Sequence, residues 1–92
     1  MYVLVAYDVV SDRRRARLAR RLVDFLPRVQ KSVFEGEVPD QRFRELERVL
    51  QDGIDPEVDS VRIYHLCRRC WGSVLEMGRG SLPVDSRDDV IL

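Results

Sequence analysis

Two patterns of hydrophobic and polar positions recur along this chain, and together they predict four strands and two helices. Residues 2–9 form an apolar run, rich in β-branched and aromatic side chains, that gives way to a charged segment, as expected of a buried strand. In residues 12–26, apolar side chains return with the period of an α-helix, with Ser11 or Asp12 as N-cap and Pro27 as the stop. A buried strand and an amphipathic helix therefore open the chain.

The remainder of the chain repeats this alternation of strands and helices. Residues 28–38 are strand-like and are predicted to form a short strand, a reversal at 31–32, and a second strand over 33–38. An apolar stripe with helical spacing predicts a helix over 40–52, and a further β-branched run predicts a strand over 59–66.

The order β-α-β-β-α-β predicts an α+β fold of the ferredoxin-like type, in which both helices cover one face of an antiparallel sheet. Residues 74–77 are compatible with an extra C-terminal strand, and the acidic and then apolar tail over 88–92 could pair with the edge of a partner's sheet. Without repeats or an interdomain linker, residues 1–92 are predicted to form a single domain.

Both faces of the first strand are mainly apolar, which favours a homodimer. A period of two places Leu4, Ala6 and Asp8 on one face and Val3 and Val5 on the other. Helices can cover only one of these faces, and a chain of 92 residues leaves much surface to bury by self-association. The 45% hydrophobic and 35% charged content is typical of a folded soluble protein. No apolar run is long enough for a membrane helix. We therefore expect a cytoplasmic location without a membrane partner.

Charge is distributed unevenly although the net charge is zero. All but one of the sixteen basic residues are arginine, and six of them fall within residues 13–21. Only one acid, Asp24, follows these arginines in the predicted helix. The alternation of acidic and basic residues that is typical of a solvated helix face is therefore missing. Because guanidinium groups match phosphate geometry, two interpretations remain open: a solvated helix face, and a phosphate-binding face that includes Arg17 and Arg20.

Asp8 is the residue around which any chemistry is predicted to be centred. A carboxylate at the end of a buried apolar strand is costly unless it meets a cation, an arginine or solvent. It could pair with Arg15, which the helical wheel places in the first turn beyond the strand, or it could cap the following helix. Alternatively it could bind Mg²⁺, a cation that prefers carboxylate oxygen. One carboxylate is a weak site, whereas two across a dimer axis are a plausible one.

Cys67 and Cys70 form a single CxxC motif. A structural zinc usually needs four ligands, and even with His65 one chain offers three at most. A thioredoxin-like redox site requires a CxxC that opens a helix after a strand, and the following Trp71 and Gly72 argue against a helix start. The motif is therefore interpreted as two ordinary thiols near a strand end, with a zinc shared across a dimer as the alternative.

Several known types of site are excluded by the absence of their motifs. The sequence contains no P-loop, GxSxG, HExxH or pair of zinc knuckles, which excludes the usual routes to nucleotide hydrolysis, serine catalysis and zinc proteolysis. What remains is a combination of three segments: YD at 7–8, QKSVFEG at 30–36 and DSVRIY at 59–64. Together they resemble CRISPR-associated protein two, the small dimeric partner of the spacer integrase, over essentially the whole chain.

The resemblance implies a ferredoxin-like homodimer with Mg²⁺ or another divalent cation held between two copies of Asp8. Members of that family are described as metal-dependent endonucleases acting on single-stranded RNA or double-stranded DNA, and as the core of the complex that inserts new spacers. The family pattern carries over to Tyr7, Asp8, Arg15, Arg17, Arg28 and Phe34. It implies no function for the CRRC segment or for the C-terminal tail.

Two main hypotheses follow for the activity. In the first, paired Asp8 residues are catalytic and hold the metal while Arg15, Arg17 and Arg28 hold the nucleic acid strand, although nothing in the sequence brings a general base to the site. In the second, the dimer bridges integrase subunits, and arginines such as Arg17 and Arg20 follow a DNA duplex without cutting it. A ribonuclease toxin of the same fold and a small-molecule regulatory domain are further alternatives.

Overall fold

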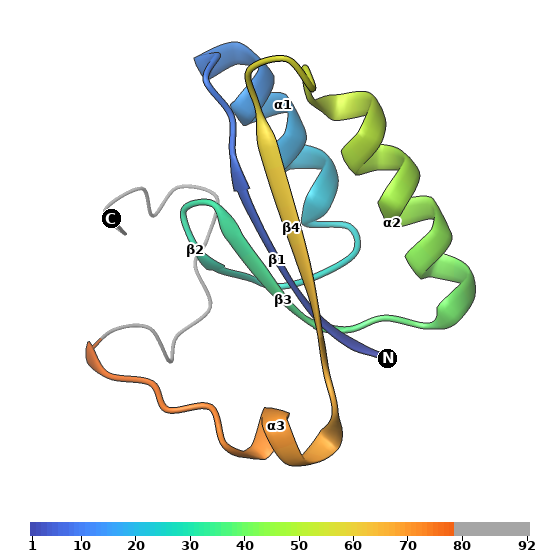
Figure 1. Ribbon diagram of the computed structural model, residues 1–92, viewed down its shortest axis with the longest axis vertical. Coiled ribbons are helices and arrows are strands. Elements are labelled where there is room, and N and C mark those ends of the chain that lie inside the picture. The colour runs from blue at the N-terminus through green and yellow to red at the C-terminus, as the bar shows by residue number, and fades with distance from the viewer. Residues whose placement is uncertain (79–92) are drawn as a thin grey trace.

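The computed structural model describes residues 1–78 and contains one antiparallel sheet with helices on one of its faces. The elements, in chain order, are β1 (Tyr2–Asp8), α1 (Asp12–Leu22), β2 (Arg28–Gln30), β3 (Val33–Glu37), α2 (Asp40–Gly53), β4 (Ser60–Leu66) and α3 (Arg68–Gly72). The strand order is β2-β3-β1-β4, and α1 and α2 lie side by side against the sheet (Figure 1). This arrangement confirms the predicted ferredoxin-like fold.

The core lies between the sheet and the two long helices, as the period of β1 predicts. Val3 and Val5 are completely buried, whereas Leu4 and Ala6, which alternate with them along the strand, are only half-buried. The buried residues of the helices meet the same face of the sheet, and with them Phe34 of β3 is fully enclosed. The opposite face of the sheet, called here the open face, carries no long helix within residues 1–78 (Figure 1).

Helix α1 ends four residues earlier than predicted, at Leu22 instead of residue 26. The N–H of Phe25 donates to the carbonyl of Leu22 (2.9 Å), which is the tighter spacing of a terminal turn. Pro27 disfavours helical geometry only in Leu26, the residue before it, so the earlier end of the helix lies in the turn over residues 23–25. Leu26 is nevertheless buried, so the apolar arc predicted for this segment still reaches the core.

Two predictions about the C-terminal part of the chain have different outcomes. Residues 74–77 form no strand, so the strand-compatible pattern there is not realised. The tail over 88–92 lies outside the described residues. Within residues 1–78, no helix is long and apolar enough to cross a membrane.

The prediction that no helix begins at the CRRC motif is wrong, because α3 begins there. Cys67 is its N-cap, and the carbonyl of Cys67 accepts a hydrogen bond from the N–H of Trp71 (2.8 Å). The ring of Trp71 stacks on Tyr2 of β1, with 4.5 Å between the ring centroids. This aromatic contact with the sheet stabilises a five-residue helix too short to be evident from periodicity.

Candidate functional site

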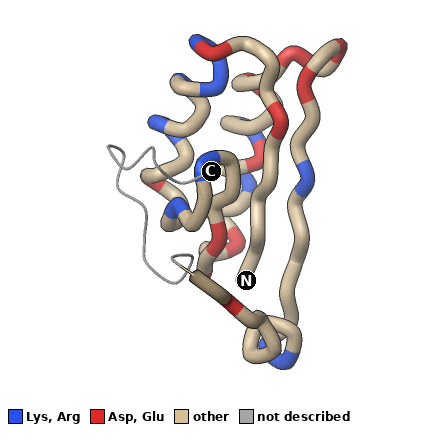
Figure 2. Tube along the Cα trace, turned by 90° about the vertical axis from the view of Figure 1, so that its left-hand side faces the viewer, with Lys and Arg blue, Asp and Glu red and all other residues tan. Residues whose placement is uncertain are grey.

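Asp8 is the last residue of β1, and its side chain belongs to the open face of the sheet. It pairs in register with Ser60 of β4, lies on the face opposite Val3 and Val5, and is exposed. Within residues 1–78, no ion pair includes Asp8. It is also the only charged residue of β1, whereas basic positions follow one another along α1 (Figure 2). Its carboxylate is therefore available to a ligand.

The predicted pairing of Asp8 with Arg15 is wrong in the described structure. Arg15 does reach back to the end of β1, but its Nη1 donates to the carbonyl oxygen of Val9 (2.7 Å) and its guanidinium pairs with Asp12. Asp8 does not cap α1 either, since Ser11 accepts the hydrogen bond from the N–H of Arg14 (3.2 Å). Both structural roles considered for Asp8 are thus filled by other residues.

A network around Asp59 sets the path of the loop between β1 and α1. The Asp59 carboxylate accepts hydrogen bonds from the N–H groups of Val10 (2.9 Å) and Asp55 (2.8 Å), and from Arg14 Nε (2.7 Å) and Nη2 (3.0 Å). The Arg14 guanidinium, with these backbone N–H groups, holds the pKa of Asp59 well below its usual range. The loop that follows Asp8 is therefore anchored to the start of β4, a role that sequence reasoning missed although Asp59 opens the DSVRIY segment.

Tyr7 and Phe34 lie in the core and not on an accessible surface. Tyr7 is 5% exposed and Phe34 is completely buried, and their ring centroids are 6.2 Å apart. Burial raises the pKa of Tyr7, although the positive charges of Arg28 and Arg15 oppose the rise. Both aromatic residues therefore support the site from inside the fold.

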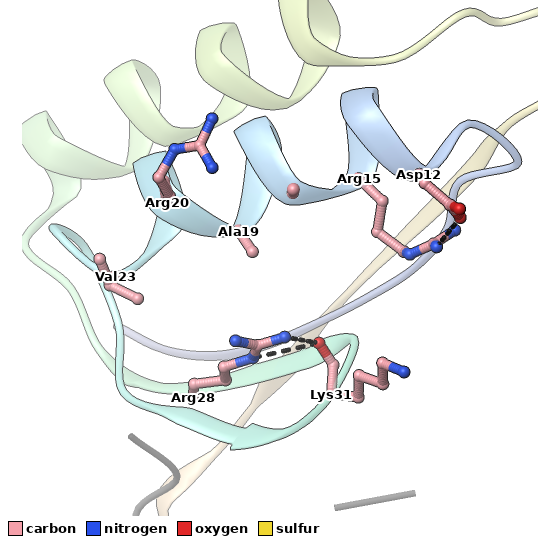
Figure 3. A pocket seen from close by; sticks show the side chains of 8 residues that line it. Asp12, Arg15, Ala19, Arg20, Val23, Arg28 and Lys31 are labelled. Carbon is pink, nitrogen blue, oxygen red and sulfur yellow. Dashed lines mark hydrogen bonds and ion pairs between the residues drawn. The ribbon is translucent and has the colours of Figure 1, made fainter. Parts of the chain in front are cut away.

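A groove of about 610 Å³ between α1 and the β2–β3 turn gathers the basic residues (Figure 3). This basic groove is lined by Asp12, Arg15, Ala16, Ala19, Arg20, Val23, Arg28 and Lys31. Arg28 is held in place, because its Nε and Nη2 donate to the carbonyl of Lys31 (3.1 and 2.6 Å) and its guanidinium lies 5.8 Å from the ring centroid of Phe34. Four cations around an apolar floor suit a phosphate-bearing chain.

The structure brings together three of the four arginines predicted to bind nucleic acid. Arg15, Arg20 and Arg28 line the basic groove, whereas Arg17 is exposed on α1 and does not line it. Lys31 is a groove residue that sequence reasoning missed, and its place at the predicted reversal beside Arg28 is the signal that could have indicated it. At its Arg15 end the groove reaches the chain just beyond β1, since Arg15 contacts the carbonyl of Val9, the residue after Asp8.

Neither Glu35 nor Glu37, the two acids of β3, lies beside Asp8 to act as a general base. Glu35 is in register with Leu4, four residues from Asp8 and thus about 13 Å along the strand. Its carboxylate accepts a hydrogen bond from the Tyr2 hydroxyl (2.8 Å), and burial together with this acid raises the pKa of Tyr2 to about 12. Glu37 pairs with the N-terminal amine of Met1 (2.8 Å).

The described residues of one protomer offer few donors for a metal. No group of three or more potential ligands occurs within residues 1–78. One protomer thus offers the exposed carboxylate of Asp8 alone, which is weak for Mg²⁺, while two such carboxylates match the preference of this cation for oxygen ligands and retained water. The described donor set of one protomer is therefore too small to hold a divalent cation by itself.

Comparisons with known proteins agree with the resemblance seen in the sequence. The family model described as CRISPR associated protein Cas2 matches residues 1–74. A relative from Chloroflexus aurantiacus, named CRISPR-associated endoribonuclease Cas2 1, is 37% identical over the full length of both chains. A relative from Thermus thermophilus, named CRISPR-associated endoribonuclease Cas2, is 35% identical, and the match spans 89% of this chain and 87% of the relative.

Solved structures show the same likeness in three dimensions. The crystal structure of Streptococcus pyogenes Cas2 at pH 6.5 matches with a TM-score of 0.73 and 38% identity, covering 85% of this chain and 100% of that one. A Thermus thermophilus protein described as hypothetical matches with a TM-score of 0.77 and 36% identity, covering 89% and 95% of the two chains. The chain therefore belongs to the CRISPR-associated protein Cas2 family.

Proposed function

We propose that this chain is a metal-dependent endonuclease that acts as a homodimer, with Asp8 of each protomer holding a divalent cation such as Mg²⁺. The observation that carries this proposal is the exposed carboxylate at the end of β1, which no ion pair within residues 1–78 neutralises. The names of the relatives, which include endoribonuclease, favour RNA as the substrate, with double-stranded DNA as the second class to test.

The composition of the open face supports a second copy of the chain as its partner. Leu4 and Ala6 of β1, with Val33 of β3 and Tyr64 of β4, form an apolar strip on this face, which is flanked in the sheet register by the charged residues Glu35 and Arg62. Tyr64 is 45% exposed although it is a large aromatic residue. Burying this apolar strip against another copy would remove it from water and bring the Asp8 side chains, on the same face, toward each other.

Each group of the chain has a definite part in the proposed cleavage. The cation, held by the two Asp8 carboxylates, would supply stabilisation of negative charge on the scissile phosphate. Arg20, Arg28 and Lys31 bind backbone phosphates in the basic groove and orient the strand. Arg15, which is paired with Asp12, holds the end of β1 through the carbonyl of Val9. Asp59 positions Asp8 indirectly, because the Asp59 carboxylate anchors the loop that follows Asp8. The attacking water gives its proton to solvent, since neither Glu35 nor Glu37 lies beside Asp8.

The experiment compares the wild type with Asp8→Asn and with Asp52→Asn, a matched change at an exposed acid of α2. Cleavage of labelled single-stranded RNA and of duplex DNA is measured while Mg²⁺ is titrated. Asp8→Asn should lose Mg²⁺-dependent cleavage while circular dichroism and gel filtration show the same folded dimer, and Asp52→Asn should cut normally. Unchanged cleavage by Asp8→Asn would remove the proposal.

A second candidate function is a non-catalytic scaffold that bridges integrase subunits on DNA. The specific observation in its favour is the basic groove, whose cations can hold a sugar-phosphate backbone without help from Asp8. In this case Asp8→Asn should leave both duplex binding and spacer integration intact. Loss of integration in that variant, with duplex binding preserved, would instead show that the metal site is needed.

A further inference from the structure

The CRRC motif occupies the position that a dithiol site requires. Cys67 directly follows Leu66, the last residue of β4, and is the N-cap of α3, so the motif opens a helix after a strand. In Figure 1, α3 lies at the far end of the sheet from the loop that follows Asp8. The motif is thus separate from both the candidate metal site and the basic groove.

The two sulfur-bearing side chains lie in one turn and are accessible. The N–H of Cys70 donates to Sγ of Cys67 (3.3 Å), and both thiols are free and exposed. This backbone hydrogen bond lowers the pKa of Cys67, while the hydrogen bond between the two side chains raises the pKa of Cys70. The pair is therefore unequal: one sulfur is the better thiolate and the other retains its proton.

The surroundings of the motif hold it in place and offer no third metal ligand. The stacking of Trp71 on Tyr2 ties α3 to β1, so the turn that carries both thiols is anchored to the sheet. His65 packs its ring edge-on against Phe43 of α2, with 5.2 Å between centroids. No cluster of three potential ligands occurs in the described part of the chain, so a single protomer does not complete a zinc site.

We propose that Cys67 and Cys70 form a thiol–disulfide exchange site, with Cys67 as the attacking thiolate and Cys70 as the resolving thiol. The substrate is a small, solvent-borne disulfide of the glutathione class, because both thiols are exposed and therefore open to a disulfide in solution. Arg68 and Arg69, between the two cysteines, favour an anionic disulfide of this kind.

The exchange is balanced in two steps. The Cys67 thiolate attacks one sulfur of the disulfide, the disulfide bond breaks, and one thiolate leaves while a mixed disulfide forms on Cys67. Cys70 then loses its proton to solvent and attacks Sγ of Cys67, which releases the second thiolate and forms the Cys67–Cys70 disulfide. Two electrons pass from the protein to the small disulfide, which ends as two thiols. Residues three apart in one turn are close enough for this bond.

The experiment treats the reduced full-length chain with glutathione disulfide and follows the products by intact-mass spectrometry. The wild type should lose two hydrogens without retaining glutathione, whereas Cys70→Ser should accumulate one glutathione adduct. Cys67→Ser is the matched control, since serine preserves the N-cap of α3. At pH 7 its adduct should form more slowly than that of Cys70→Ser, because the backbone N–H at position 70 still lowers the pKa of Cys67 in the latter variant, and a lower pKa raises the thiolate fraction more than it reduces nucleophilicity.

Three outcomes would overturn the proposal. The first is glutathione retained on both cysteines of the wild type, and the second is equal rates for the two single variants. The third is tight zinc binding by the wild type that protects both thiols, which would indicate a metal site shared between copies. None of these measurements involves nucleic acid, so the result is independent of the proposed endonuclease activity.

Discussion

Neutralising Arg28 should reduce by one the number of phosphates that the basic groove contacts. Four basic side chains line the groove, and Asp12 offsets Arg15, so about three phosphates are neutralised by each protomer. For a single strand, each contact contributes about −0.7 to the slope of log affinity against log salt concentration, which predicts a slope of about −2. Affinity should then fall about 20-fold between 50 and 200 mM salt for the wild type, and about 7-fold for Arg28→Gln.

Fluorescence anisotropy with a labelled single-stranded oligonucleotide, repeated across this range of salt, measures both slopes. Arg44→Gln is the matched control, because Arg44 is an exposed arginine of α2 that does not line the groove. Its slope should equal that of the wild type. Circular dichroism must show that Arg28→Gln keeps its fold, since Arg28 also holds the β2–β3 turn through the carbonyl of Lys31. Equal slopes for Arg28→Gln and the wild type would refute the assignment of the groove.

Three further predictions concern stability. Folding lowers the pKa of Asp59, so the Asp59 carboxylate stabilises the fold fully above about pH 4, and this stabilisation is lost as the pH falls toward the folded-state pKa. Asp59→Asn should therefore unfold at a lower temperature than the wild type at pH 7. Its melting temperature should also depend less on pH in acid. Gly36→Ala places a Cβ 2.8 Å from Cδ of the rigid Pro27 ring, and it should lower the free energy of unfolding measured in urea by about 1–3 kcal/mol. Gly72→Ala is the control: it has open space around its Cβ and should change this free energy by less than about 0.5 kcal/mol. Phe34→Leu should lose about 1–2 kcal/mol of stability, and the folded variant should lose less RNA affinity than Arg28→Gln, because only the ring beside Arg28 changes; an equal or larger loss would show that Phe34 is more than a core residue.

The sequence alone determined the elements that carry the candidate site. The strict alternation along β1 placed Asp8 on the face opposite Val3 and Val5, because the side-chain period of a strand is two whatever surrounds it. The amphipathic pattern after residue 12 likewise placed arginines on one helix next to the strand end. The dimer, the metal and the roles of the arginines stay predictions.

Only the tertiary structure decided which groups meet. The helical wheel put Arg15 near the end of β1, but its partner is the carbonyl of Val9 because Asp59, 49 residues from Val10, fixes the path of the loop. Helix α3 depended in the same way on a contact between Trp71 and the first strand. Periodicity reports which side of an element a residue occupies, whereas hydrogen bonds between distant segments depend on how the elements pack, and one chain's local pattern contains no record of that packing.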